Sequence, residues 1–199
     1  MDVARAWDIL LRRKTFLVGT LAFSLADEPL RCQPIADHTA SLVFVDLISI
    51  LDNALSEKLL ALGLLDRTTL FDRIEALNKA GALIDAQSLH ALRERRNALA
   101  HDLDRIKSHE LDDALNKVEA QLQAWQFVSP RPNYIPFGDR SEWRKCETPG
   151  DLPYERDFSI GVQIAETGRP VLQYKFIQYV DSPDNPKFSI RVDLKPVGE

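Results

Sequence analysis

Cysteine is scarce in this chain of 199 residues, and positive charge is not in excess. Cys32 and Cys146 are the only cysteines, and their wide separation excludes a disulfide framework or a cysteine-based zinc site. The formal net charge is −5 at pH 7, whereas proteins that coat long nucleic acids are usually basic. The charge argues against that role, but it leaves room for a local cleft that binds one phosphate. We expect reduced thiols in a cytoplasmic protein.

The hydrophobic run nearest the N-terminus is short. The stretch 15–26, "TFLVGTLAFSLA", follows "RRK" and resembles a signal peptide. It is too short to span a bilayer as a helix, and the residues before it already follow a helical apolar period. We therefore expect a core helix and no membrane partner.

Glycine and proline are rare in the first part of the chain. Within residues 1–128 they occur only at Gly19, Pro29, Pro34, Gly63 and Gly81. Apolar side chains at helical spacing predict helices over about 3–26, 38–62, 69–80, 86–106 and 108–127. Both prolines are expected to interrupt the chain between the first two helices, and Thr68 is expected to cap the third. The sequence predicts a helical bundle over 1–128.

The remainder of the chain has a different pattern. Residues 129–155 hold five prolines and two glycines, which is typical of a connector without helix or strand. Beyond it, apolar and polar residues alternate over 157–166, 170–180 and 187–194. These segments predict a small antiparallel meander over 156–199, whose apolar face needs a cover from helices, connector aromatics or a second subunit. The expected fold class is α+β, a mainly α-helical bundle with a C-terminal three-stranded antiparallel sheet.

The fourth predicted helix carries an arginine where a leucine is expected. Its apolar stripe follows spacings of three and four residues, and it consists of Leu89, Leu92, Arg96, Leu99, Leu103 and Ile106. A guanidinium cannot lose its proton, so burial of Arg96 would require partners. Asp52 lies at the edge of the apolar stripe of the second helix and is the candidate for a structural ion pair.

A second polar group lies on the same helix. Asn97 and His101 are four residues apart and share a face, close to that of His90, which we expect to be solvated. On a straight helix Arg96 and His101 point about 140° apart. Both can reach one ligand only if the helix bends or a second subunit completes the site.

The segment "RNALAH", Arg96 to His101, resembles the Arg-x4–6-His signature of the HEPN superfamily. The preceding "AGALIDAQSLHALRER" is similar to the region before that motif, and the resemblance covers about 38–127. It implies a bundle of four or five helices with the motif on a late helix, and it does not extend to the sheet. A weaker similarity links the helix order and "LRE" segment to the mannitol-operon repressor family.

The resemblance implies a function. Many HEPN proteins are metal-independent ribonucleases, often toxins or defence effectors, which act as dimers across a shared cleft. His101 would then transfer protons, Arg96 would bind the scissile phosphate, and Asn97 would orient the phosphate or the histidine. Arg93 and Arg95 are the neighbouring candidates for RNA phosphate contacts. No cofactor or metal is expected, and a regulatory or antitoxin protein is a possible partner.

An alternative of a different class stays open. Some HEPN proteins cleave nothing and serve as regulatory or protein-interaction modules. Under this interpretation Arg96 is a structural cation and His101 is an exposed helix histidine. Asp102 and Asp104 favour it, because carboxylates beside His101 repel phosphate.

Overall fold

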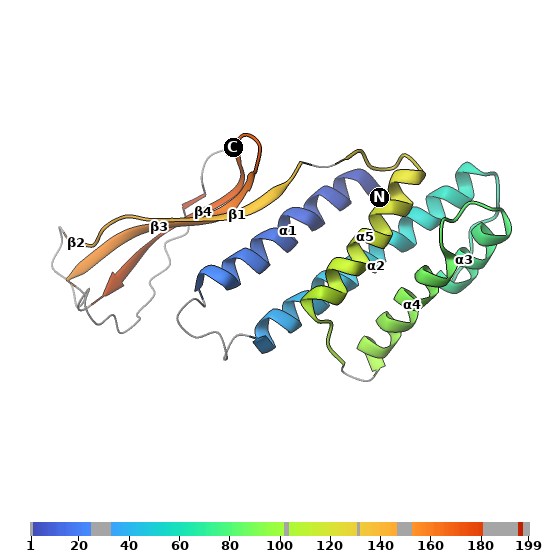
Figure 1. The fold of residues 1–199 in the computed structure, drawn as a ribbon, viewed down its shortest axis with the longest axis horizontal. Coiled ribbons are helices and arrows are strands. Elements are labelled where there is room, and N and C mark those ends of the chain that lie inside the picture. Colours follow the sequence, from blue (N-terminus) through green and yellow to red (C-terminus); the bar gives the residue numbers. More distant parts are fainter. Residues whose placement is uncertain are drawn as a thin grey trace.

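The structure is a computed structural model that describes residues 2–24, 33–101, 104–130, 132–146, 153–180 and 195–196. Within these residues the helices are α1 (Val3–Ser24), α2 (Gln33–Ala61), α3 (Leu70–Lys79), α4 (Ala86–His101) and α5 (Ser108–Ala124). The strands are β1 (Tyr134–Arg140), β2 (Arg144–Lys145), β3 (Tyr154–Ile164), β4 (Pro170–Val180) and β5 (Lys195–Pro196). The helices form a bundle, and the sheet extends along α1 (Figure 1). This confirms the predicted α+β class with a mainly helical bundle.

Helix α2 is the centre of the bundle and packs against the other four helices. Leu47, Leu51, Leu55 and Leu59 are fully buried on it and follow one another at intervals of four residues, so they form a continuous core stripe. Removing each such side chain from water contributes roughly 1.5–3 kcal/mol to folding. The remaining helices cover this stripe with their own buried leucines and isoleucines.

Within the described part of the chain, one helical segment, Thr39–Ala61 of α2, is long and apolar enough to cross a membrane. In the bundle, 56% of its most apolar window is buried. Packing against four other helices is sufficient to explain an apolar composition of this kind.

The helix ends follow the predicted stop signals in most places. Gly63 and Gly81 have φ of 70° and 66° just beyond α2 and α3, in the left-handed region that glycine adopts without strain. Thr69, rather than the predicted Thr68, caps α3, because its side chain accepts a hydrogen bond from the Asp72 N–H at 3.1 Å. Helix α2 begins at Gln33, earlier than predicted, since Pro34 is tolerated in a first turn.

Helix α4 ends at His101, so its predicted extension to residue 106 is wrong. Residues 104–107 are not helical, and Ile106 is buried from this segment rather than from the helix stripe. Its backbone N–H donates to the Ser41 hydroxyl on α2 at 3.0 Å. This hydrogen bond fixes the α4–α5 connection to the core, and it requires a non-helical backbone at Ile106.

The sheet is antiparallel, with the order β1-β3-β4-β5 and with β2 paired to β3. Strands β3 and β4 confirm two of the three predicted strands and meet at a turn in which Gly168 has φ of 65°. The third predicted strand, 187–194, lies outside the described residues.

The prediction that 129–155 contains no strand is wrong, because β1 and β2 lie within it. Strand β1 is at the edge of the sheet, where Pro136 can replace a residue with an N–H at no cost to an interior ladder. Phe137 on β1 pairs with Gly161 on β3, and the close ring leaves no space for a Cβ at that glycine. The prolines and glycines of this segment are therefore compatible with an edge strand, although their frequency predicts a connector without strands.

Helix α1 covers the sheet. Phe158, Ile160 and Val162 alternate along β3 and are buried, on a strand that packs against α1. The Tyr134 hydroxyl on β1 donates to Asp8 of α1 at 2.6 Å. Of the three covers considered for the meander, the structure therefore shows a helix, assisted by a connector aromatic.

Candidate functional site

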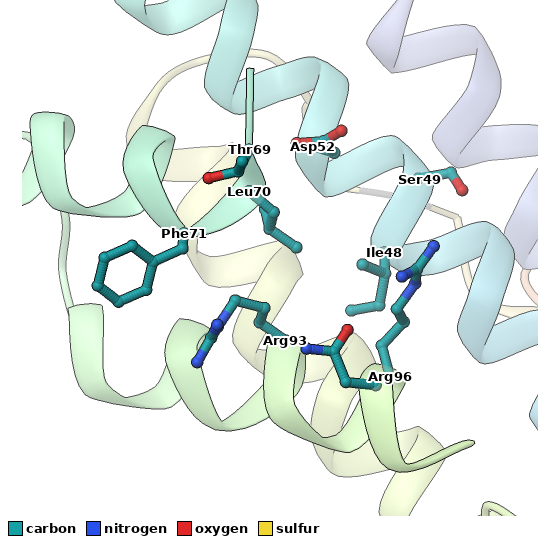
Figure 2. A pocket seen from close by; sticks show the side chains of 9 residues that line it. Ile48, Ser49, Asp52, Thr69, Leu70, Phe71, Arg93 and Arg96 are labelled. Atoms are coloured by element: carbon teal, nitrogen blue, oxygen red, sulfur yellow. The ribbon is translucent and has the colours of Figure 1, made fainter. Parts of the chain in front are cut away.

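A cavity of about 320 Å³ opens between α2, the start of α3 and α4. Ile48 and Leu70 contribute apolar side chains to it, and the polar groups come from all three elements (Figure 2). The lining residues are Ile48, Ser49 and Asp52 of α2, Thr69, Leu70 and Phe71 at the start of α3, and Arg93, Arg96 and Asn97 of α4. Three of the residues singled out on α4, and also Asp52, therefore meet at one place.

Arg96 is exposed and makes no hydrogen bond or ion pair with any residue that the structure describes. The expectation that it is a buried cation paired with Asp52 is therefore wrong. Leu89 and Leu92 are the buried residues of α4, while Leu99 is only half-buried, so the stripe leaves the core in the second half of the helix. Arg96 lies in this second half of α4, at the mouth of the cavity instead of inside the core.

Asp52 is a structural ion-pair residue, as predicted, but with a different partner. Its carboxylate lies 2.7 Å from Nη1 of Arg73, a residue of α3. The Nε of the same guanidinium lies 2.9 Å from Asp66. Hydrogen bonds from Arg73 and then from Ser56 hold the pKa of Asp66 below its usual value. Arg73 therefore pairs with the carboxylate that was predicted to pair with Arg96.

Arg93 lies at the rim of the cavity beside an aromatic ring. The guanidinium is 5.1 Å from the centre of the Phe71 ring, and its Nη2 is 3.1 Å from Glu94. The Nε of Arg93 is buried without a hydrogen-bond partner in the described structure. Arg93 is therefore available only in part as a phosphate contact.

His90 is not solvated, contrary to expectation. Its Nε2 lies 2.9 Å from Glu75, and its ring lies 5.1 Å from that of Phe71. The pair fixes the imidazole between α3 and α4. His90 is a packing residue that supports the rim of the cavity.

Arg95 points away from the cavity and holds the α4–α5 connection. Its guanidinium pairs with Asp104, donates to the Arg105 carbonyl at 2.7 Å and lies 3.1 Å from Glu110. The hydrogen bond from Arg95 is the main cause that lowers the pKa of Asp104. Burial acts to raise the pKa of Glu110, but hydrogen bonds from the Lys107 N–H and Arg95 lower it. The expectation that Arg95 contacts RNA does not fit this geometry, because its donors are already occupied.

We expect Arg95→Ala to lower the free energy of unfolding by about 1–2 kcal/mol at pH 7, the value for charged hydrogen bonds discounted for partial exposure. Because both carboxyl groups have a lowered pKa in the fold, their stabilisation is complete above about pH 5 and is lost as the pH falls through the folded-state pKa. Thermal unfolding of wild type and variant at pH 7 and pH 3 measures this. Arg105→Ala, which keeps the carbonyl, is the matched control. An equal deficit at both pH values would contradict the assignment.

His101 is the last residue of α4, is exposed and does not line the cavity. Asp102, its neighbour, lies outside the described residues. The structure thus brings Arg96 and Asn97 together with Arg93 and Asp52, while His101 and Arg95 lie elsewhere. This agrees with the separation of about 140° that the helical period gives for Arg96 and His101. Across the described ranges, no group of three or more His, Cys, Asp or Glu side chains is placed to hold a metal.

Sequence reasoning missed the contributions of Ser49, Thr69 and Phe71 to the cavity. Phe71 had a detectable signal, since it is an aromatic residue outside the apolar stripe of α3, whose buried members are Ile74 and Leu77. Ser49 and Thr69 had none, because isolated hydroxyl residues on helices and caps are common for structural reasons. Comparison of the chain with protein-family models, curated proteins and solved structures finds no match.

Proposed function

We propose that the protein is a HEPN-like, metal-independent ribonuclease of toxin or defence type, which acts in the cytoplasm as a homodimer. The observation that carries the proposal is the state of Arg96, an exposed guanidinium that lies at the mouth of a cavity and has no partner among the residues the structure describes. A structural arginine would use its donors on carboxylates, as Arg73 and Arg95 do. A planar fork of free donors is suited to the oxygens of a phosphate.

The chemistry requires only side chains. The ribose 2′-oxygen attacks the neighbouring phosphorus, the bond from phosphorus to the 5′-oxygen breaks, and the proton is transferred from the first oxygen to the second. Arg96 stabilises the charge that develops on the phosphate, and Asn97 orients it. His101 is the candidate for proton transfer, since imidazole titrates near neutral pH. In this proposal His101 comes from the second subunit, because it lies outside the cavity of its own chain.

A second candidate function, a non-catalytic regulatory or protein-interaction module, is favoured by the same position of His101. An exposed histidine at a helix end, outside the cavity, needs no catalytic role. The cavity would then receive an anionic group of a regulatory or antitoxin partner at Arg96.

The decisive test is cleavage of single-stranded RNA in excess EDTA. We expect wild-type protein to cleave the RNA and His101→Ala to lose about 10²-fold or more of the rate, in line with loss of a general acid or base. His109→Ala on α5 is the matched control, because His109 is also an exposed helix histidine. Absence of cleavage by a folded wild-type protein at any concentration would reject the catalytic proposal and favour the interaction module.

A further inference from the structure

Phe71 is a large aromatic residue that the fold fixes but leaves 45% exposed. It lies in the first turn of α3, at the rim of the cavity. The guanidinium of Arg93 and the ring of His90 both contact it, each about 5.1 Å from the ring centre. Both residues belong to α4, so the ring is held from that helix. Figure 2 shows the side chains of Phe71 and Arg93 pointing to one side of the cavity and that of Arg96 to the other.

The charges around Phe71 favour an anionic ligand. Arg93 and Arg96 are three residues apart on α4, and neighbours at this spacing have Cβ atoms about 5–6 Å apart. Of the acids at the cavity and its border, Asp52 is paired with Arg73, whereas the Asp72 carboxylate accepts from the Thr69 hydroxyl at 2.7 Å and keeps its negative charge. Single-stranded nucleic acid is bound by the combination of exposed aromatic rings and positive charge, and here the charge of Arg96 has no partner among the described residues.

We propose that Phe71 is a stacking platform for one base of single-stranded RNA, across the cavity from the phosphate that Arg96 binds. This assignment rests on the proposed function and adds the place where one unpaired base of the RNA is held. A paired base cannot stack on a side chain, because its two faces are covered by neighbouring base pairs. The cavity of about 320 Å³ that both residues line is at the lower end of the range for small-molecule sites.

The test measures binding separately from cleavage. In a His101→Ala background, fluorescence anisotropy gives the affinity for a short labelled single-stranded RNA. We expect Phe71→Ala to weaken binding about 10-fold, within the range measured for loss of one base–aromatic stack. Phe71→Trp should retain the affinity. Leu65→Ala is the matched control, since Leu65 is 80% exposed and does not line the cavity.

Phe71→Leu separates stacking from folding. Leucine keeps an apolar contact for Arg93 and His90 but has no aromatic face, so its melting temperature should stay near that of the parent while RNA affinity falls. A set of RNAs, each with one abasic position, provides a second readout. At one position, removal of the base should weaken binding to the parent and have no further effect on Phe71→Ala.

The outcomes are distinguishable from those of the cleavage test. Binding by Phe71→Ala and Phe71→Leu as tight as that by Leu65→Ala overturns the stacking role, while EDTA-resistant cleavage by wild type still supports the ribonuclease. If the parent binds no single-stranded RNA, the stacking role is also overturned, and the cleavage assay alone decides the proposed function.

Discussion

Replacement of Arg96 by alanine is expected to lower RNA cleavage on the order of 10²-fold, the loss seen when one donor to a developing negative charge is removed. The same substitution should leave the free energy of unfolding within about 0.5 kcal/mol of wild type, because Arg96 is exposed and has no partner among the described residues. Steady-state cleavage of RNA in EDTA and thermal unfolding measure the two effects. Arg96→Ala should therefore lower the cleavage rate without lowering the free energy of unfolding.

Two variants sharpen the result. Arg96→Lys keeps the charge but loses the planar fork, so it should recover only part of the rate. Arg169→Ala in the turn between β3 and β4 is the matched control, since Arg169 is an exposed arginine outside the cavity. Unchanged cleavage by Arg96→Ala would show that the free guanidinium has no role in the reaction. A large decrease in the free energy of unfolding of Arg96→Ala would instead show that Arg96 has a structural role.

The bundle was predictable because its signals are local. Buried leucines recur at helical spacing in α2, and glycines with positive φ end α2 and α3 where the sequence places them. The strand β1 was not predictable in this way. Pro136 and Gly138 are permitted there only because β1 is an edge strand that packs on β3 and α1, and that position depends on tertiary structure.

The three arginines of "RERRN" show why the site was only partly predictable. Their residue type and spacing identify them, but their roles depend on which acids the fold brings near them. Arg95 forms ion pairs with Asp104 and Glu110, and Arg93 forms one with Glu94. Asp52, the predicted partner of Arg96, is instead paired with Arg73. Arg73 belongs to α3, and helical spacing on α4 gives no information about its reach. Only the assembled bundle shows that, of the three, Arg96 has no carboxylate partner within the described part of the chain.

Mixed dimers are expected to recover activity from two inactive variants. In the proposed composite site, Arg96 and His101 come from different subunits, because one cavity holds Arg96 and excludes the histidine of its own chain. In a symmetric dimer the same pair then occurs twice. A heterodimer of Arg96→Ala with His101→Ala has one site in which both residues are intact and one in which both are lost. Its activity should be about half that of wild type, while each variant alone stays on the order of 10²-fold lower.

Co-expression with two different affinity tags and sequential purification isolates this heterodimer. Cleavage of single-stranded RNA in excess EDTA then compares it with each homodimer and with wild type carrying the same tags. Recovery to about half of the wild-type rate requires that the two side chains act across the subunit boundary, since no single chain in the mixture has both. A heterodimer as inactive as its parents would contradict the composite site. Arg96 and His101 would then have to meet within one chain, which the end of α4 at His101, outside the cavity, does not allow without a rearrangement of this helix.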